Sequence, residues 1–357
     1  MSVQGGVEPW LIYGAYGYTG RLIVARALER GLRPILAGRD PVATRRLAES
    51  SGLEWRAFSL DDGEALRRGV GDVKLVLNVA GPFSATWRPV LDACLDARCS
   101  YLDITGEIDV LEAMQELDER ARAAGVHVVP AVGFDVVPTD CAAAMAADLL
   151  EGATVLDLAF HLSGGPSRGT TLTAIERLGW GGAVRRLGRI EPVPIGSIRE
   201  TIRFSDRPRS GVAIPWGDVS TAYRSTGIPN IRVFATLPRG VPMIGRLFGA
   251  ALAIPPVRKL ATWATRRLVT GPGPEELRKG HARVRAEVRD AAGRSAAVEL
   301  VTPNAYTLTA TASVAAVERV LSGAVATGPG VHTPSNAFGT TFATELSGVD
   351  VAEETPT

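Results

Sequence analysis

A glycine-rich turn near the start of the chain constrains its fold more than any other feature. Gly14, Gly17 and Gly20 follow the apolar run 7–13 and precede apolar residues at helical spacing. A strand, a glycine turn and a helix start together make a pyrophosphate site, because glycines admit phosphates to the main chain and the helix N-terminus offers N–H groups. The spacing therefore predicts a dinucleotide-binding domain.

The composition indicates an ordinary globular protein. With 357 residues, 46% hydrophobic and 22% charged, the chain can form two cores, and its net charge of +1 provides no basic field for nucleic acid. The three cysteines and four histidines lack metal-ligand spacing, so we expect no metal site. We see no signal segment and no apolar run long enough to span a membrane, and we expect a cytoplasmic location.

The pattern of expected elements changes about halfway along the chain. Residues 1–140 alternate strand-like and helix-like segments, which predicts an α/β domain with a Rossmann-type doubly wound parallel sheet. Strands are expected at 7–13, 32–37, 55–59, 73–79, 100–104 and 127–132, and helices at 41–51, 87–97 and 110–124.

Residues 141–325 show a different pattern. Apolar and charged residues alternate at 282–289, a hairpin turn follows at 290–294, and 155–162, 198–204 and 231–236 are further strand candidates. We expect a second α+β domain with a mostly antiparallel sheet, serving substrate binding or dimerisation. The segment 326–350 is expected to return to the first domain.

The end of the second strand sets the choice of cofactor. Gly38, Arg39 and Asp40 stand where an NAD site has a carboxylate for the ribose. A guanidinium suits a 2′-phosphate, so we expect NADP(H). There are two alternatives. Arg39 is a solvated loop arginine, or Asp40 faces the ribose instead. Asp61 follows the third strand and is expected near the adenine, or is a plain loop carboxylate.

Later loops supply the other expected cofactor contacts. The loop after the fourth strand should pass beneath the nicotinamide ribose, where Gly81 permits close approach and Pro82 stiffens the turn. Asn78 is equally interpretable as a core amide. The expected cofactor-binding residues are Gly14, Tyr16, Gly17, Tyr18, Thr19, Gly20, Gly38, Arg39, Asp61, Asn78, Ala80, Gly81 and Pro82.

Carboxylates follow the fifth and sixth strands, at the edge where a doubly wound sheet binds its ligand. Each has a helix-capping alternative. Asp140 could cap a helix at 141–149, and Glu107 could start the helix that directly follows Glu107 in the chain. The expected substrate-binding residues are Asp103, Thr105, Glu107, Arg168 and Thr170, the last two from the glycine- and hydroxyl-rich turn 163–171. The candidate proton donors are Tyr18, Asp135 and Asp140, whereas Tyr16 is expected only to stack.

Missing motifs exclude other chemistries. No tyrosine precedes a lysine by four residues, so the acid of short-chain dehydrogenases is absent. The chain also has no Walker lysine motif.

Several of these segments together resemble the saccharopine dehydrogenase-like oxidoreductase family. The resemblance lies in 13–20, 37–39, 78–83, 101–103, 133–140 and 333–339. It implies an NADP-binding Rossmann domain, a second α+β domain and a C-terminal segment packed near the first. The family includes enzymes that handle saccharopine, trans-acting enoyl reductases of polyketide lipids, and lipid-associated members.

The resemblance also bears on the substrate. We see no clear equivalent of the amino-acid-binding residues of saccharopine enzymes, which favours an NADPH-dependent reductase of an apolar, acyl-carrier-linked or other acyl-linked substrate such as an enoyl thioester. The alternatives are a C=N or C=O reductase of an amino-acid-like substrate and a non-catalytic NADP(H)-binding protein.

One segment of the second domain suggests a further contact. Residues 243–257 are apolar apart from Arg246, and Arg258, Lys259, Arg266 and Arg267 follow. An apolar helix with a basic flank indicates peripheral membrane contact through 243–267, or a cover over an acyl channel. The alternative is a core helix or the interface of a homodimer.

Overall fold

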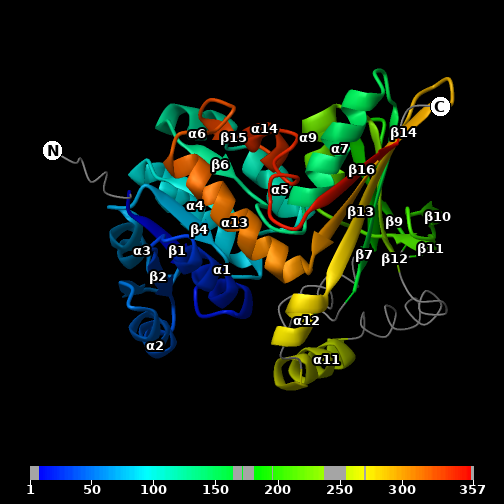
Figure 1. Ribbon diagram of the computed structural model, residues 1–357. Helices are drawn as coiled ribbons and strands as arrows, with labels where there is room; N and C mark the ends of the chain where they lie inside the picture. The colour runs from blue at the N-terminus through cyan, green and yellow to red at the C-terminus, as the bar shows by residue number, and fades with distance from the viewer. Residues whose placement is uncertain are drawn as a thin grey trace. The chain divides into compact units, whose positions relative to one another are not determined.

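The computed structural model describes residues 8–163, 171, 181–194, 196–236, 255–268 and 271–354 (Figure 1). Two compact units divide the chain. Unit 1 comprises Met1–Phe134 and Thr309–Phe338, and unit 2 comprises Asp135–Leu308 and Gly339–Thr357. The division differs from the expected boundaries at 140 and 325, because the helix that begins at Val137 packs on the second sheet and the end of the chain contributes to both units.

Unit 1 contains the parallel sheet expected from the sequence. Its order is β15-β6-β5-β4-β1-β2-β3, with every neighbouring pair parallel. This is the doubly wound arrangement in which the strand order reverses beside β1, the place where such sheets bind nucleotides. The strands are β1 (Trp10–Tyr13), β2 (Ile35–Gly38), β3 (Trp55–Ala57), β4 (Leu75–Asn78), β5 (Ser100–Asp103), β6 (His127–Val129) and β15 (Gly330–Val331).

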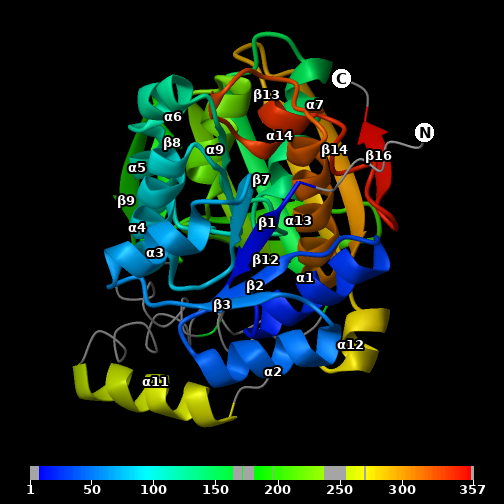
Figure 2. The same ribbon diagram turned by 90° about the vertical axis from the view of Figure 1, so that its left-hand side faces the viewer.

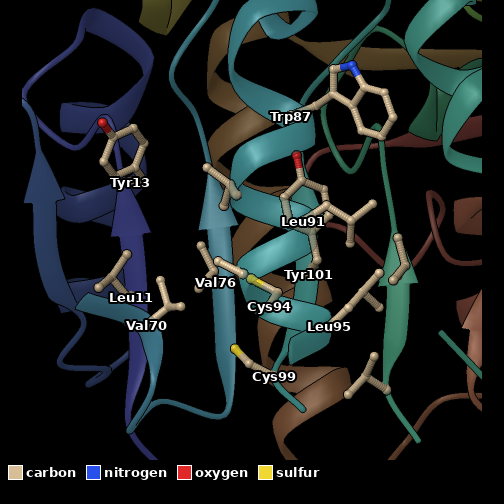
Figure 3. Packing of buried hydrophobic residues seen from close by; sticks show 14 of the residues in the cluster. Leu11, Tyr13, Val70, Val76, Trp87, Leu91, Cys94, Leu95, Cys99 and Tyr101 are labelled. Carbon is tan, nitrogen blue, oxygen red and sulfur yellow. The ribbon is translucent and has the colours of Figure 1, made fainter. Parts of the chain in front are cut away.

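Helices cover both faces of this sheet. Figure 2 shows α3 to α6 on one side and α1 and α13 on the other. On the first side, Leu11, Val76 and Tyr101 belong to one buried cluster with Leu91 and Leu95 of α4 (Figure 3). The helices are α1 (Tyr18–Glu29), α2 (Pro41–Ser51), α3 (Gly63–Val70), α4 (Phe83–Ala97), α5 (Ile108–Gln115), α6 (Asp118–Ala124), α13 (Ala305–Leu321) and α14 (Pro334–Phe338).

Some helix boundaries differ from the expected ones. The helix expected at 110–124 is two helices, because the chain leaves helical geometry at Leu117, where φ is −96° and ψ is 7°. The helix expected at 141–149 begins at Val137, with Pro138 in its first turn, where the missing N–H of proline costs nothing.

Unit 2 contains the second sheet, which is antiparallel except for the β7–β12 pair. Helices α7 and α9 pack on one face, against the buried Ala282, Val284, Ala286 and Val288 of β13 and its neighbours (Figure 1). The strands are β7 (Val155–Leu162), β8 (Gly182–Arg186), β9 (Arg189–Val193), β10 (Arg199–Arg203), β11 (Pro208–Ala213), β12 (Asn230–Thr236), β13 (His281–Arg289), β14 (Ser295–Pro303) and β16 (Asp350–Glu354). The helices are α7 (Val137–Leu149), α9 (Asp218–Thr226), α11 (Pro255–Leu268) and α12 (Pro274–Lys279).

The C-terminal segment is shared between the units. β15 pairs with β6 in unit 1, as expected of a returning segment, whereas β16 pairs with β14 in unit 2. Within the described ranges, no helix combines the length and the hydropathy that a membrane crossing requires.

Candidate functional site

The turn between β1 and α1 has two glycines that the protein's own backbone requires. Gly14 has a φ of +89°, and a Cβ there would lie 2.8 Å from the nitrogen of Ala80. A Cβ on Gly20 would lie 2.6 Å from the carbonyl oxygens of Gly14 and Ala15. Real side chains do not tolerate such contacts, so these two glycines set the shape of the turn.

Gly17 is different, because its surroundings would admit a side chain. Its φ of −64° and ψ of 167° suit any residue, and a Cβ would meet only the oxygen of Gly14, at 3.2 Å. Gly17 is also the N-cap of α1, and among the described residues no side chain caps this helix and no acid occupies its first turn. A bare, positively polarised helix start fits an anionic group placed against Gly17.

The end of β2 lies beside this turn, since the nitrogen of Gly14 donates to the oxygen of Ala37 at 2.8 Å. The ring of Tyr16 covers Gly38, where its Cε1 would be 2.5 Å from a Cβ. Arg39 is exposed and has no hydrogen bond or ion pair within the part of the chain that is described. The site therefore presents an uncommitted guanidinium next to the turn, which fits a 2′-phosphate.

The side chain of Asp40 caps the helix that follows it. Its Oδ1 accepts hydrogen bonds from the nitrogens of Val42 and Ala43, both at 3.0 Å, so it is the N-cap of α2. Asp61 is exposed and accepts a local hydrogen bond from Ser59 at 3.2 Å. Its expected contact with adenine stays a prediction.

Asn78 acts within unit 1 as a buried amide. Its Nδ2 donates to the Tyr101 hydroxyl at 3.2 Å and to Oγ1 of Thr86 at 3.3 Å, and its Oδ1 accepts from the nitrogen of Ala80 at 3.1 Å. Thr86 in turn donates to the oxygen of Ala80 at 2.6 Å. Asn78 therefore shapes the loop of Ala80, Gly81 and Pro82, in which the Gly81–Pro82 bond is cis.

Asp103, expected to bind substrate, is fully buried and joins β5 to the segment after β6. It accepts hydrogen bonds from the Tyr101 hydroxyl at 2.8 Å and from the nitrogens of Thr105 and Ala131 at 3.0 and 2.9 Å. Burial raises the pKa of Asp103 to about 6, although the two backbone hydrogen bonds lower it. The carboxylate holds together the loops that follow two neighbouring strands.

Glu107 is the N-cap residue of α5, the helix that it was expected to start, but its side chain does not cap that helix. Its two carboxylate oxygens accept from the nitrogens of Phe83 and Ser84, each at 3.0 Å, at the start of α4. Oγ1 of the buried Thr105 accepts from the nitrogen of Glu107 at 3.1 Å. The loop after β5 therefore anchors the helix that follows the Gly81 loop, and these polar groups support the site from within unit 1.

The titration of Asp103 predicts a pH-dependent stability. Because its folded pKa of about 6 lies above the ordinary value, the folded state binds the proton more tightly, and the resulting stabilisation is complete at low pH and lost as pH rises through 6. Relative to Asp103→Asn, we expect the free energy of unfolding of the wild type to fall by up to about 3 kcal/mol between pH 4 and 7. Urea titrations of both proteins measure this difference, and a constant difference across that range would contradict the buried, proton-binding carboxyl.

The candidate proton donors belong to different units. Tyr18 starts α1 in unit 1 and is partly exposed, whereas Asp135 and Asp140 belong to unit 2. Asp135 is partly exposed. Asp140 is fully buried and accepts a hydrogen bond from Ser225. It lies within the first turn of α7, whose N-cap is Val136, so the expected capping role is wrong.

Sequence reasoning missed a partner of Asp140. Asp218, in the first turn of α9, is fully buried. Burial, the larger cause, and the negative charge of the nearby Asp140 both raise the pKa of Asp218 well above its ordinary value. Oγ1 of Thr139 lies 2.9 Å from its Oδ2. No local sequence pattern predicts this pair, because only the packing of α7 on α9 brings the two carboxyls near each other.

Unit 2 also holds a charged groove of about 320 Å³ that the sequence did not reveal. Arg232 donates to both oxygens of Asp157, at 2.6 and 2.7 Å, and Arg289 contacts Asp157 at 2.5 Å and Glu287 at 2.8 Å. The groove is lined by Asp157, Ala159, Glu200, Thr201, Ile202, Arg232, Arg285, Glu287 and Arg289. Arg168 and Thr170, expected to bind substrate, lie outside the described residues.

The strand order and the glycine turn define the class of unit 1 as a dinucleotide-binding Rossmann domain. The family model of the saccharopine dehydrogenase NADP-binding domain matches residues 10–129. Residues 10–129 therefore belong to this domain family, as the resemblance implied, and the expected cofactor NADP(H) is confirmed at the level of the domain family.

Relatives of known name extend this finding. A probable mitochondrial saccharopine dehydrogenase-like oxidoreductase from Arabidopsis thaliana is 37% identical over 156 residues, covering 38% of this chain and 33% of the relative. The human saccharopine dehydrogenase-like oxidoreductase is 26% identical over 249 residues, covering 60% and 58%. A trans-acting enoyl reductase from Mycobacterium ulcerans is 29% identical over 138 residues, covering 36% and 33%. The matches thus span between a third and three-fifths of these relatives.

A solved structure supports the whole fold. Saccharopine dehydrogenase (L-Glu forming) from Saccharomyces cerevisiae aligns with a TM-score of 0.68 over 97% of this chain and 100% of the yeast chain, at 12% identity. The identity is low, so this likeness establishes the architecture of the two domains and not the reaction.

Proposed function

We propose that the protein is an NADPH-dependent reductase of an apolar, acyl-linked substrate, an enoyl thioester being the model case. The observation that carries the cofactor half is the bare start of α1 at Gly17, with the uncommitted Arg39 beside it. Gly17 and the helix N-terminus would hold the pyrophosphate, and Arg39 the 2′-phosphate. The loop of Ala80, Gly81 and Pro82, which Asn78 shapes, would border the nicotinamide ribose.

When bound, the cofactor supplies a hydride to the electron-poor β-carbon of such a substrate. The C=C bond becomes a single bond, and a proton must reach the α-carbon. Of the three candidate acids, Tyr18 and Asp135 keep exposed surface, whereas Asp140 is enclosed and hydrogen-bonded to Ser225. We therefore favour Tyr18, Asp135 or water as the proton source, with alignment supplying most of the rate.

Two observations support an acyl-linked substrate. One relative is a trans-acting enoyl reductase. In addition, each guanidinium in the charged groove of unit 2 already has a carboxylate, since Arg285 reaches Glu287 at 3.4 Å and Arg232 and Arg289 share Asp157. Such a groove offers no uncommitted cation to a substrate carboxylate.

The groove nevertheless favours a second candidate function. Three arginines in one concave site of unit 2 are what reduction of a C=N or C=O bond in an amino-acid-like substrate would need, provided that the substrate displaces Asp157 or Glu287. The fold of the yeast saccharopine dehydrogenase is compatible with this reaction. An Arg289→Ala change would then raise the KM of a keto acid and leave that of an enoyl thioester unchanged.

A substrate panel tests the proposal. Purified protein is mixed with NADPH and either enoyl thioesters of increasing acyl length or keto acids with an amine, and oxidation of NADPH is followed by absorbance. Gly17→Val provides the background rate. Turnover that rises with acyl length supports the proposal, and turnover with keto acid and amine alone assigns the second function. Tight NADPH binding without turnover of any substrate would identify a non-catalytic NADP(H)-binding protein. The expected cytoplasmic location and homodimer stay predictions.

A further inference from the structure

Helix α11 carries its large apolar side chains outward. A surface helix ordinarily turns its apolar stripe to the core. In α11, Leu260, Trp263 and Leu268 are 64%, 56% and 78% exposed, and Val257 is 36% exposed, whereas Thr265 is 7% exposed. At 3.6 residues per turn these four apolar residues fall within an arc of about 140°. We call this set of four residues the outer face of α11.

This concentration of apolar surface is unusual in the molecule. The outer face holds four of the nine exposed large hydrophobic side chains of the described ranges, and the others are scattered over several elements. Single exposed apolar residues are ordinary on protein surfaces, but a contiguous group marks a place of contact.

The charges of α11 point to the nature of that contact. The helix contains four basic residues and no acid. Arg258, Lys259 and Arg267 are exposed and have no carboxylate partner in the described part of the chain. Some basic residues on other helices do have one, as Arg45 with Glu49 and Lys279 with Glu275 show. Arg267 also lies over the ring of Trp263, 5.5 Å from its centre.

We propose that the outer face of α11 docks on an anionic phospholipid bilayer, with the helix lying in the plane of the surface. The apolar side chains would enter the boundary between headgroups and acyl chains, while the lysine and arginines reach the lipid phosphates. The 14 residues of the helix extend about 21 Å, too short to cross a bilayer. A second copy of the chain is a poorer occupant, because a two-fold contact would bring Arg258, Lys259 and Arg267 of one copy close to the same residues of the other.

Vesicle flotation tests the proposal. The full chain is mixed with vesicles of phosphatidylcholine alone, or of phosphatidylcholine with phosphatidylglycerol, at low and high salt. The variants are Leu260→Ser/Trp263→Ser, which removes apolar surface, and Lys259→Ser/Arg267→Ser, which removes charge. The matched control is Val42→Ser/Leu187→Ser, since these residues are 75% and 84% exposed elsewhere. All the substituted side chains are exposed, so the fold should persist, and circular dichroism and the thermal midpoint verify it.

We expect the wild type and the control to float with the anionic vesicles, and each α11 variant to bind at least tenfold more weakly. High salt should weaken binding, and vesicles without anionic lipid should bind little. Flotation that is equal for all variants, or absent for the wild type, would overturn the proposal. So would a dimer in solution that Leu260→Ser/Trp263→Ser dissociates while vesicles remain unbound, because the outer face would then be an interface between copies. These results are independent of the substrate and the cofactor.

Discussion

Gly17→Val is expected to weaken NADPH binding strongly while leaving the fold intact. The φ and ψ of Gly17 suit valine, and a Cβ there meets only the oxygen of Gly14, at 3.2 Å. The isopropyl group would occupy the space in which a pyrophosphate approaches the bare start of α1. We expect the dissociation constant of NADPH to rise on the order of 100-fold, equivalent to about 3 kcal/mol. Isothermal titration calorimetry measures the binding, and urea unfolding should show a change in stability within about 1 kcal/mol.

Gly14→Ala separates this effect from damage to the turn. Even a methyl group on Gly14 would lie 2.9 Å from Cα and Cβ of Ala80, and the φ of +89° disfavours any L side chain. We expect Gly14→Ala to lower the free energy of unfolding by about 2 kcal/mol or more. If Gly17→Val bound NADPH within twofold of the wild type, the turn would not be the cofactor site, and the reductase proposal would lose its main support.

Arg39→Ala is expected to weaken NADPH far more than NADH. Arg39 is exposed and has no partner in the described residues, so its loss should not perturb the fold. A guanidinium that forks onto a phosphate contributes about 1.5–3 kcal/mol, which corresponds to roughly 10- to 100-fold in the dissociation constant of NADPH. NADH lacks the 2′-phosphate, and its affinity should change little.

Arg46→Ala is the matched control for this experiment. Arg46 is an exposed arginine of α2, the helix that Asp40 caps beside Arg39. We expect both nucleotides to bind this variant as they bind the wild type. Added salt should also reduce the difference in NADPH affinity between the wild type and Arg39→Ala, because screening weakens an exposed charge contact. An equal loss of NADPH and NADH affinity in Arg39→Ala would refute the assignment of the 2′-phosphate.

Much of the fold was predictable because its signals are local. The alternation of strand and helix periods predicted the parallel sheet of unit 1, and the strand expected at 155–162 matches β7. The antiparallel hairpin of β13 and β14 followed from alternation around Gly293. Helix starts were predicted less well. Val137 begins α7 earlier than expected, since a proline in the first turn does not interrupt a helix.

The roles of polar residues were much harder to predict, because they depend on distant partners. Glu107 caps α4 through Phe83 and Ser84, which lie 24 and 23 residues away in the sequence. Asp103 binds the nitrogen of Ala131, 28 residues away. A carboxylate after a strand looks the same in the sequence whether it binds a ligand or holds a loop, and only the register of β4, β5 and β6 brings these groups together.

The sequence by itself determined that the first domain is a dinucleotide-binding domain, because a strand, a glycine turn and a helix start are adjacent in the chain and need no distant contact. Tertiary structure alone decided which glycine leaves room for a ligand. Gly14 and Gly20 are crowded by backbone from Ala80 and Ala15, whereas Gly17 is not. It also decided that the apolar side of α11 faces outward, since exposure depends on what the rest of the chain covers.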